Sequence, residues 1–252
     1  MPIPADLRDE IRHAEDIGRQ LYVLDKVAAI ATDVLVARVP NFRDDKLAGY
    51  IPSREGTEDG RPKDSYAVLF FTTDDPPRIA YEVRVIPNAP PEFKANTPPK
   101  PATESFVLLA RARAAAIAAL PPIHQPMNPV IVPGAARDEK GILVYMIAGT
   151  TTSNVAVFGQ HFRVLVPDDG KAPRYVMPLS KTAVELPTKG PKGQTLEALM
   201  ITQIVTDWPL ETHVLVSLQT KLPVYVGTRR GIWRVNGDKI VLISDHPPDE
   251  PR

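Results

Sequence analysis

The stretch Gly231–Ile243, "GIWRVNGDKIVLI", decides the fold class that we expect for this chain. Two β-rich runs flank Asn236–Gly237, and asparagine and glycine both tolerate the positive φ that a tight hairpin turn needs. Alternation along a strand places Trp233 and Val235 on one face and Arg234 on the other. We therefore predict a hairpin that turns at Asn236–Gly237 and buries at least half of Trp233.

The same pattern of short β-rich runs separated by turn residues, such as "DDGK", extends over residues 135–246. The links between these runs are of turn length, which is too short for crossover helices, so we expect antiparallel pairing. The region predicts a mostly antiparallel β domain, arranged as a meander, sandwich or partly closed barrel. One segment, "KGQTLEALMITQIV" at 192–205, fits either a strand or a helix.

Residues 1–125 predict a different, α+β part of the chain. A long amphipathic helix should run from a cap at Asp6 to about Ala31, and a hairpin should join "SYAVLFFTT" to "RIAYEVRVI". A second helix is expected over 102–120, capped by Thr103 or Ser105. We interpret the polar stretch 41–64 as a loop and the proline-rich stretch 88–104 as a linker. The expected apolar stripe of the first helix comprises Leu7, Ile11, Ala14, Ile17, Leu21, Leu24, Ala28 and Ala31.

Composition limits the function classes. Among 252 residues, Lys plus Arg and Asp plus Glu each number 30, and this zero net charge disfavours a general nucleic-acid binder. The absence of cysteine excludes disulfides, thiolate metal sites and a cysteine nucleophile. The charged start lacks the apolar region of a secretory signal, and no apolar run approaches the roughly 18 residues that span a bilayer. We expect a soluble cytoplasmic protein without a cofactor, nucleic acid or membrane partner.

The stretch "DWPLETHVLVSL", Asp207–Leu218, holds the first candidate site. Pro209 cannot donate to a ladder, so we predict a strand that begins near Glu211. In a strand, Glu211 and His213 would share one face. The run that follows is apolar on both faces, which is typical of a strand covered on both sides, and it should therefore lie near the centre of the β domain with His213 partly buried.

A third polar residue, His161 in "VFGQHFRVLV", would meet this pair if the two strands were neighbours. Two imidazoles and a carboxylate suit Zn²⁺ or Fe²⁺, although we expect no metal. The same three groups would suit acid–base catalysis with Ser180 or Ser217 as the nucleophile. The alternative is that each is an ordinary hydrogen-bonded side chain of a sheet.

The second candidate site is the basic and aromatic run "YVGTRRGIWRV" at 225–235. Arg229 and Arg230 would recognise an anion beside Trp233, because guanidinium groups bind phosphate and carboxylate bidentately. The same residues also fit a hairpin tip whose charges keep a sheet edge from pairing with another molecule.

No nucleotide-binding, hydrolase, metalloprotease, zinc-finger or calcium-loop motif occurs in the sequence. We therefore expect a non-catalytic binding or protein-interaction protein, with a protein partner or self-association through the first helix or a sheet edge. Two alternatives stay open: a hydrolase built on His161, Glu211 and His213, and a binder of small anions. The sequence therefore does not decide whether the chain is an enzyme. An interaction helix should be exposed in the monomer, whereas a core helix should be buried.

Overall fold

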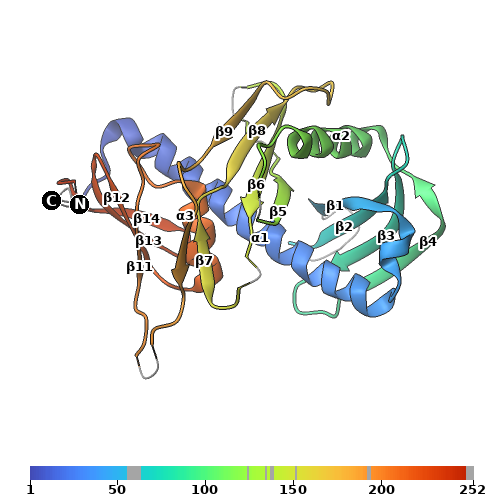
Figure 1. The fold of residues 1–252 in the computed structure, drawn as a ribbon, viewed down its shortest axis with the longest axis horizontal. Helices are drawn as coiled ribbons and strands as arrows, with labels where there is room; N and C mark the ends of the chain where they lie inside the picture. Colours follow the sequence, from blue (N-terminus) through green and yellow to red (C-terminus); the bar gives the residue numbers. More distant parts are fainter. Residues whose placement is uncertain are drawn as a thin grey trace.

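The computed structural model describes residues 1–55, 64–123, 125–133, 135–136, 139–150, 152–191 and 194–247. Over these ranges the strands form three four-stranded sheets and one two-stranded ribbon, arranged along a single long helix, α1 (Arg8–Arg38) (Figure 1). The predicted α+β class with mostly antiparallel pairing is confirmed. The sheets are separate and follow one another along the molecule.

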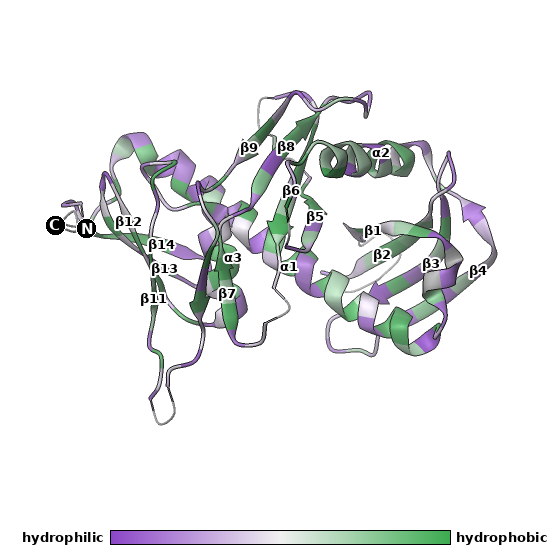
Figure 2. Ribbon diagram, viewed as in Figure 1, coloured by the Kyte–Doolittle hydropathy of each residue, from purple (hydrophilic) through white to green (hydrophobic). Residues whose placement is uncertain are grey.

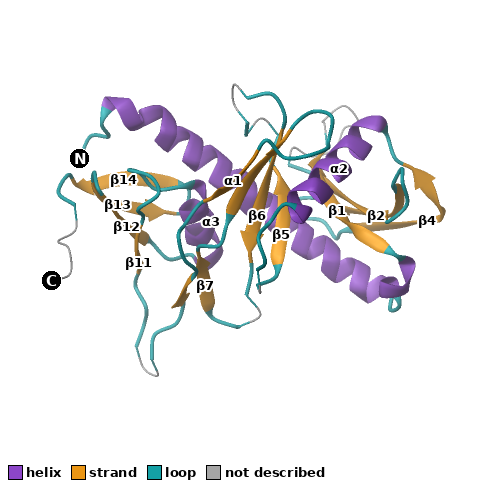
Figure 3. Cartoon of the chain, turned by 45° about the horizontal axis from the view of Figure 1, so that its top comes forward, coloured by secondary structure: helices purple, strands orange, loops and turns teal. Residues whose placement is uncertain are grey.

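Helix α1 buries its predicted apolar stripe against its own chain. Its successive turns enter three different clusters of the core: Ile11 packs with the last sheet, Leu21 with the middle sheet, and Ala31 with the first sheet. Figure 3 shows α1 passing the three sheets in turn. The helix begins through a 3-10 turn, η1 (Ala5–Leu7), and the expected cap residue Asp6 pairs with Arg230 instead.

The first sheet has the antiparallel order β1-β2-β3-β4, and its central hairpin is the predicted one. Its strands are β1 (Leu47–Arg54), β2 (Tyr66–Thr72), β3 (Arg78–Val85) and β4 (Glu92–Pro101).

Two sequence interpretations were wrong in this sheet. The supposed loop 41–64 contains η2 (Phe42–Asp45) and β1, while its residues 56–63 lie outside the described part. The supposed linker 88–104 contains β4, an edge strand. Prolines are tolerated there because the outer side of an edge strand needs no ladder donors.

The middle sheet, of order β5-β6-β8-β9, is covered on one face by helix α2 (Glu104–Ala118). Thr103 caps α2 by accepting a hydrogen bond from the Phe106 amide, as predicted. The strands are β5 (Met127–Ile131), β6 (Ile142–Ala148), β8 (Phe162–Val166) and β9 (Tyr175–Pro178). A separate ribbon pairs β7 (Val155–Phe158) with β10 (Val184–Pro187).

The last sheet contains the predicted hairpin, formed by β13 (Gly231–Asn236) and β14 (Lys239–Ser244). Asn236 pairs with Lys239, so the turn consists of Gly237 and Asp238, one residue later than predicted; Gly237 has a φ of 59°, and Trp233 is completely buried, as expected. The sheet also holds β12 (Val224–Thr228) and β11 (Leu199–Thr202), which settles the ambiguous segment 192–205 as containing a strand. Strands β11 and β12 are parallel, an exception to the expected antiparallel pattern.

The strand that we predicted to begin near Glu211 is wrong: the segment forms helix α3 (Glu211–Thr220), the crossover between the parallel strands β11 and β12. All residues from Glu211 to Ser217 are buried, so this part of the helix is covered on every face, and Figure 2 shows α3 with both hydrophobic and hydrophilic residues. A helix buried all round lacks the amphipathic period that identifies a helix in sequence. The apolar residues on both faces of the predicted strand therefore indicated burial correctly, but the predicted secondary structure was wrong.

Helix α3 crosses α1 closely at Gly18. A Cβ atom at this position would overlap the side chain of Val214 and lie 2.7 Å from the Glu211 carbonyl oxygen. Because α1 also packs on strands from both halves of the sequence, the proposed division into residues 1–125 and 135–246 stays a prediction. Among the described residues, no helix combines the length and apolar character needed to cross a membrane.

Candidate functional site

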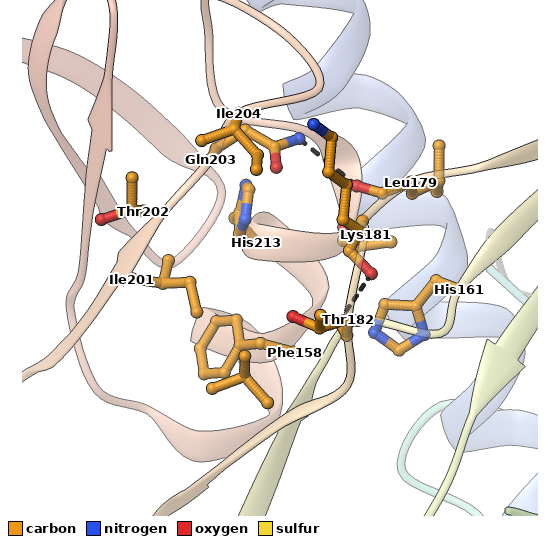
Figure 4. Close-up of a pocket in the computed structure, with 14 residues that line it drawn as sticks. Phe158, His161, Leu179, Lys181, Thr182, Ile201, Thr202, Gln203, Ile204 and His213 are labelled. Atoms are coloured by element: carbon orange, nitrogen blue, oxygen red, sulfur yellow. Dashed lines mark hydrogen bonds between the residues drawn. The ribbon is translucent and has the colours of Figure 1, made fainter.

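One small pocket brings together three residues singled out in the sequence: His161, Ser180 and His213. Its volume is about 70 Å³, and its walls come from the ends of β7 and β11, the segment after β9, and the start of α3. Figure 4 shows the His213 ring near Ile201 and Gln203, with the His161 ring beside Thr182.

His161 uses both of its ring nitrogens within the protein. Its Nδ1 accepts a hydrogen bond from the Ala148 amide at 3.0 Å, so Nε2 carries the proton and donates to the Val157 carbonyl oxygen at 3.3 Å. Burial lowers the pKa of His161 to about 4, because the charged form would lose its hydration. The residue is therefore a neutral, hydrogen-bonded side chain at pH 7.

His213 acts as a cap for α3. Its Nδ1 accepts a hydrogen bond from the Leu210 amide at 2.9 Å, which satisfies a backbone donor at the start of the helix. Burial again lowers the pKa, to about 4. The prediction that His213 is at least partly buried is confirmed. Its Nδ1 lone pair is occupied, so only an Nε2–H donor remains available.

Glu211 lies on helix α3 rather than on a shared strand face with His213, and its carboxylate binds Arg163 instead of either histidine. The Arg163 Nε and Nη2 atoms donate to the two carboxylate oxygens at 2.6 and 2.5 Å. Burial alone would raise the pKa of Glu211, but the Arg163 charge outweighs it and holds the pKa below its usual value. Glu211 does not line the pocket of the two histidines.

The two candidate serines hold loops in place. Ser180 Oγ donates to the Thr182 carbonyl and accepts from the Gln160 amide, both at 3.0 Å. Ser217 Oγ donates to the Leu222 carbonyl at 2.8 Å. Neither hydroxyl has a histidine partner within the part of the chain that the structure describes.

The two arginines of the predicted anion site already form ion pairs with carboxylates of the chain itself. Arg229 Nε donates to Asp207 at 2.7 Å, and the two terminal nitrogens of Arg230 lie 3.1 and 3.3 Å from Asp6. Trp233 lies in the core, with its indole N–H donating to Thr228 at 3.0 Å. An anion would have to displace these partners, and its binding at Arg229 and Arg230 stays a prediction.

A much larger cleft of about 630 Å³ lies between the first two sheets, beside α1 and α2. Five polar residues are at its rim: Gln20, Ser53, Arg54, Tyr66 and Glu139. Sequence reasoning missed this cleft, because its lining comes from five distant segments and its aliphatic residues carry the same signal as a filled core. The apolar wall contains Leu24, Ile51, Leu109, Ile131, Val132 and Leu143.

Over the described ranges, no group of three or more His, Asp or Glu side chains is placed to hold a metal ion. No family model, no curated protein and no solved structure matches this chain.

Proposed function

We propose that this chain is a non-catalytic binding protein, and that its ligand is a small molecule with an apolar body held in the cleft between β1 and β5. The observation that carries the proposal is the cleft itself, whose volume of about 630 Å³ and mostly aliphatic wall match those of small-molecule sites. Such sites combine an apolar wall with a few polar groups that orient the ligand.

The hydrolase alternative has less support. A general base needs a free lone pair on a ring nitrogen, but His161 Nδ1 and His213 Nδ1 both accept backbone hydrogen bonds. The Glu211 carboxylate, which would orient such a base, is occupied by Arg163. Catalysis at this pocket would require at least one of these buried bonds to break.

The protein-interaction alternative is also weakened. The α1 stripe, the expected docking surface, is already covered by the chain's own sheets. Two of the edge strands, β1 and β5, contain proline, at Pro52 and Pro129, which removes a backbone donor that strand addition there would use, whereas the edge strands β11 and β14 contain none. A small ligand in the cleft needs neither surface.

The test is the binding of N-phenyl-1-naphthylamine, an uncharged dye that fluoresces in apolar sites, followed by displacement with hexanol, octanol and decanol. Each methylene removed from water contributes about 0.8 kcal/mol, so displacement should strengthen about fourfold per added methylene. A flat dependence on chain length would overturn the proposal.

A pair of variants on strand β1 tests whether the dye binds in the cleft. Ser53→Trp puts a large ring at the cleft rim and should abolish dye binding. Ala48→Trp puts the same ring on the same strand outside the cleft and should leave binding unchanged. Equal dye affinities in the two variants would place the dye elsewhere and contradict the proposed site.

A further inference from the structure

A polar recess of about 280 Å³ adjoins the apolar cleft, and Ala136, Glu139 and Leu143 line both spaces. The recess lies between the start of α1 and the middle sheet. Its far wall contains Tyr145 of β6 and Arg163 of β8. A molecule that occupies the cleft therefore has polar protein groups next to one end of it.

Tyr145 is the residue that marks this recess as a binding site. Its side chain is completely buried, and its hydroxyl has no hydrogen-bond partner among the residues that the structure describes. Burial raises the pKa of Tyr145 well above its ordinary value, and the neighbouring Glu211 and Arg163 also affect it, so the hydroxyl lies beside this ion pair without a hydrogen bond of normal geometry to either residue. A buried, unpartnered hydroxyl costs about 1–3 kcal/mol, and native proteins rarely leave one without a role.

Arg163 supplies a second donor. Its Nε and Nη2 atoms are held by Glu211, whereas Nη1 has no acceptor among the described residues. The Arg163 side chain keeps 20% of its surface exposed, which is compatible with a group that faces an open recess. The guanidinium carbon also lies 6.0 Å from the Tyr145 ring centre, so the two donors belong to one packed unit.

The charges around the recess select the kind of group that would bind there. The positive charge of Arg163 is already balanced by the buried Glu211. Two further carboxylates, Glu10 and Glu139, line the recess together with His13. Among the described residues, an anionic group would meet these carboxylates without a surplus positive charge, whereas an uncharged oxygen would accept hydrogen bonds at no such cost.

We infer that the ligand is an amphipathic molecule whose alkyl part fills the cleft and whose uncharged, oxygen-bearing head group, such as an amide or alcohol, lies in the recess. The head oxygen accepts hydrogen bonds from the Tyr145 hydroxyl and from Arg163 Nη1. This inference rests on the proposed function, because it assigns the second half of the same ligand.

The experiment compares decanamide, decanoate and decyltrimethylammonium as competitors of N-phenyl-1-naphthylamine on the wild-type protein. Decanamide should bind at least tenfold more tightly than either charged analogue. Equal affinities would overturn the inference even if the dye binds, whereas failure of the dye to bind at all would overturn the proposed function instead.

Tyr145→Phe tests the donor directly. The substitution removes only the hydroxyl, so the dye affinity should not change, while the affinity for decanamide should fall about fivefold to tenfold. Tyr225→Phe, on the outer face of the last sheet, is the matched control and should change neither affinity. An unchanged decanamide affinity in Tyr145→Phe would contradict the assigned role of the hydroxyl.

Discussion

The two buried histidines should make the protein unstable in mild acid. His161 and His213 have a pKa of about 4 in the folded chain, against an ordinary value of 6.5. As the pH falls below 6.5, the unfolded chain takes up protons on these residues while the folded chain does not. The stabilisation is therefore complete above pH 6.5 and is lost progressively as the pH falls towards 4.

The expected size of this effect follows from the two pKa values. Their difference corresponds to about 3–4 kcal/mol for each histidine, or roughly 7 kcal/mol together. Many domains have a total stability of only about 5–15 kcal/mol, so the protein should approach unfolding between pH 5 and 4.

Two carboxylates also change their contribution to the folding stability as the pH falls, and the two changes have opposite signs. Burial raises the pKa of Asp25, which favours the folded chain as the pH falls. The charge of Arg163 holds the pKa of Glu211 below its ordinary value despite burial, so the stabilisation by that pair is lost only at lower pH. The histidine contribution must therefore be isolated as a difference between variants.

The assay is urea unfolding at several pH values between 7.5 and 4.5 for the wild type, His161→Asn and His213→Asn. The asparagine oxygen can replace Nδ1 as the acceptor for the Ala148 or Leu210 amide, but it does not titrate. Each variant should be less stable at pH 7.5, and this deficit should shrink by roughly 2–3 kcal/mol at pH 4.5. The exposed His246→Asn serves as the control and should run parallel to the wild type. A deficit that stays constant with pH for both buried positions would refute the reasoning.

Three further changes test the packing, each by urea unfolding at neutral pH. Gly18→Ala should destabilise the protein by about 1–3 kcal/mol, because the overlap with Val214 outweighs the gain of about 1 kcal/mol in helix propensity. A more stable variant would contradict the close crossing of the two helices. Gly237→Val should cost about 1 kcal/mol or more and Gly237→Asn less, because asparagine tolerates positive φ, and equal costs would show that φ is not the cause. Glu211→Leu should cost about 3–5 kcal/mol by leaving the mostly buried Arg163 without its partner. Adding Arg163→Met should restore most of the loss, and no restoration would show that the charge is not the cause.

The elements predicted correctly are those with a local pattern in the sequence. The stripe of α1 repeats at three- and four-residue steps, and the β13–β14 hairpin carries a turn signal between alternating strands. Helix α3 was missed because burial on all faces removes its amphipathic period. Strand β4 was missed because its prolines resemble those of a linker, and only its edge position explains them.

The candidate residues were identified only in part. His161, His213 and Ser180 do line one pocket, although the strand pairing that suggested their proximity is absent. The partner of Glu211 was not foreseen, because Arg163 lies 48 residues away and meets it only when the fold brings their side chains together. No spacing rule applies to such a contact, since the tertiary fold alone determines it.

The position of α1 has a consequence for the order in which the chain folds. The first turns of the helix are completed by the last strands: Glu15 accepts a hydrogen bond from the Ile240 amide, 225 residues later. At about 5–20 residues per second of synthesis, roughly 10–45 s separate the appearance of these two groups. Throughout that interval Leu7 and Ile11 lack the strands that cover them in the native protein. The start of the helix is therefore among the first segments to be made and the last to gain its native contacts.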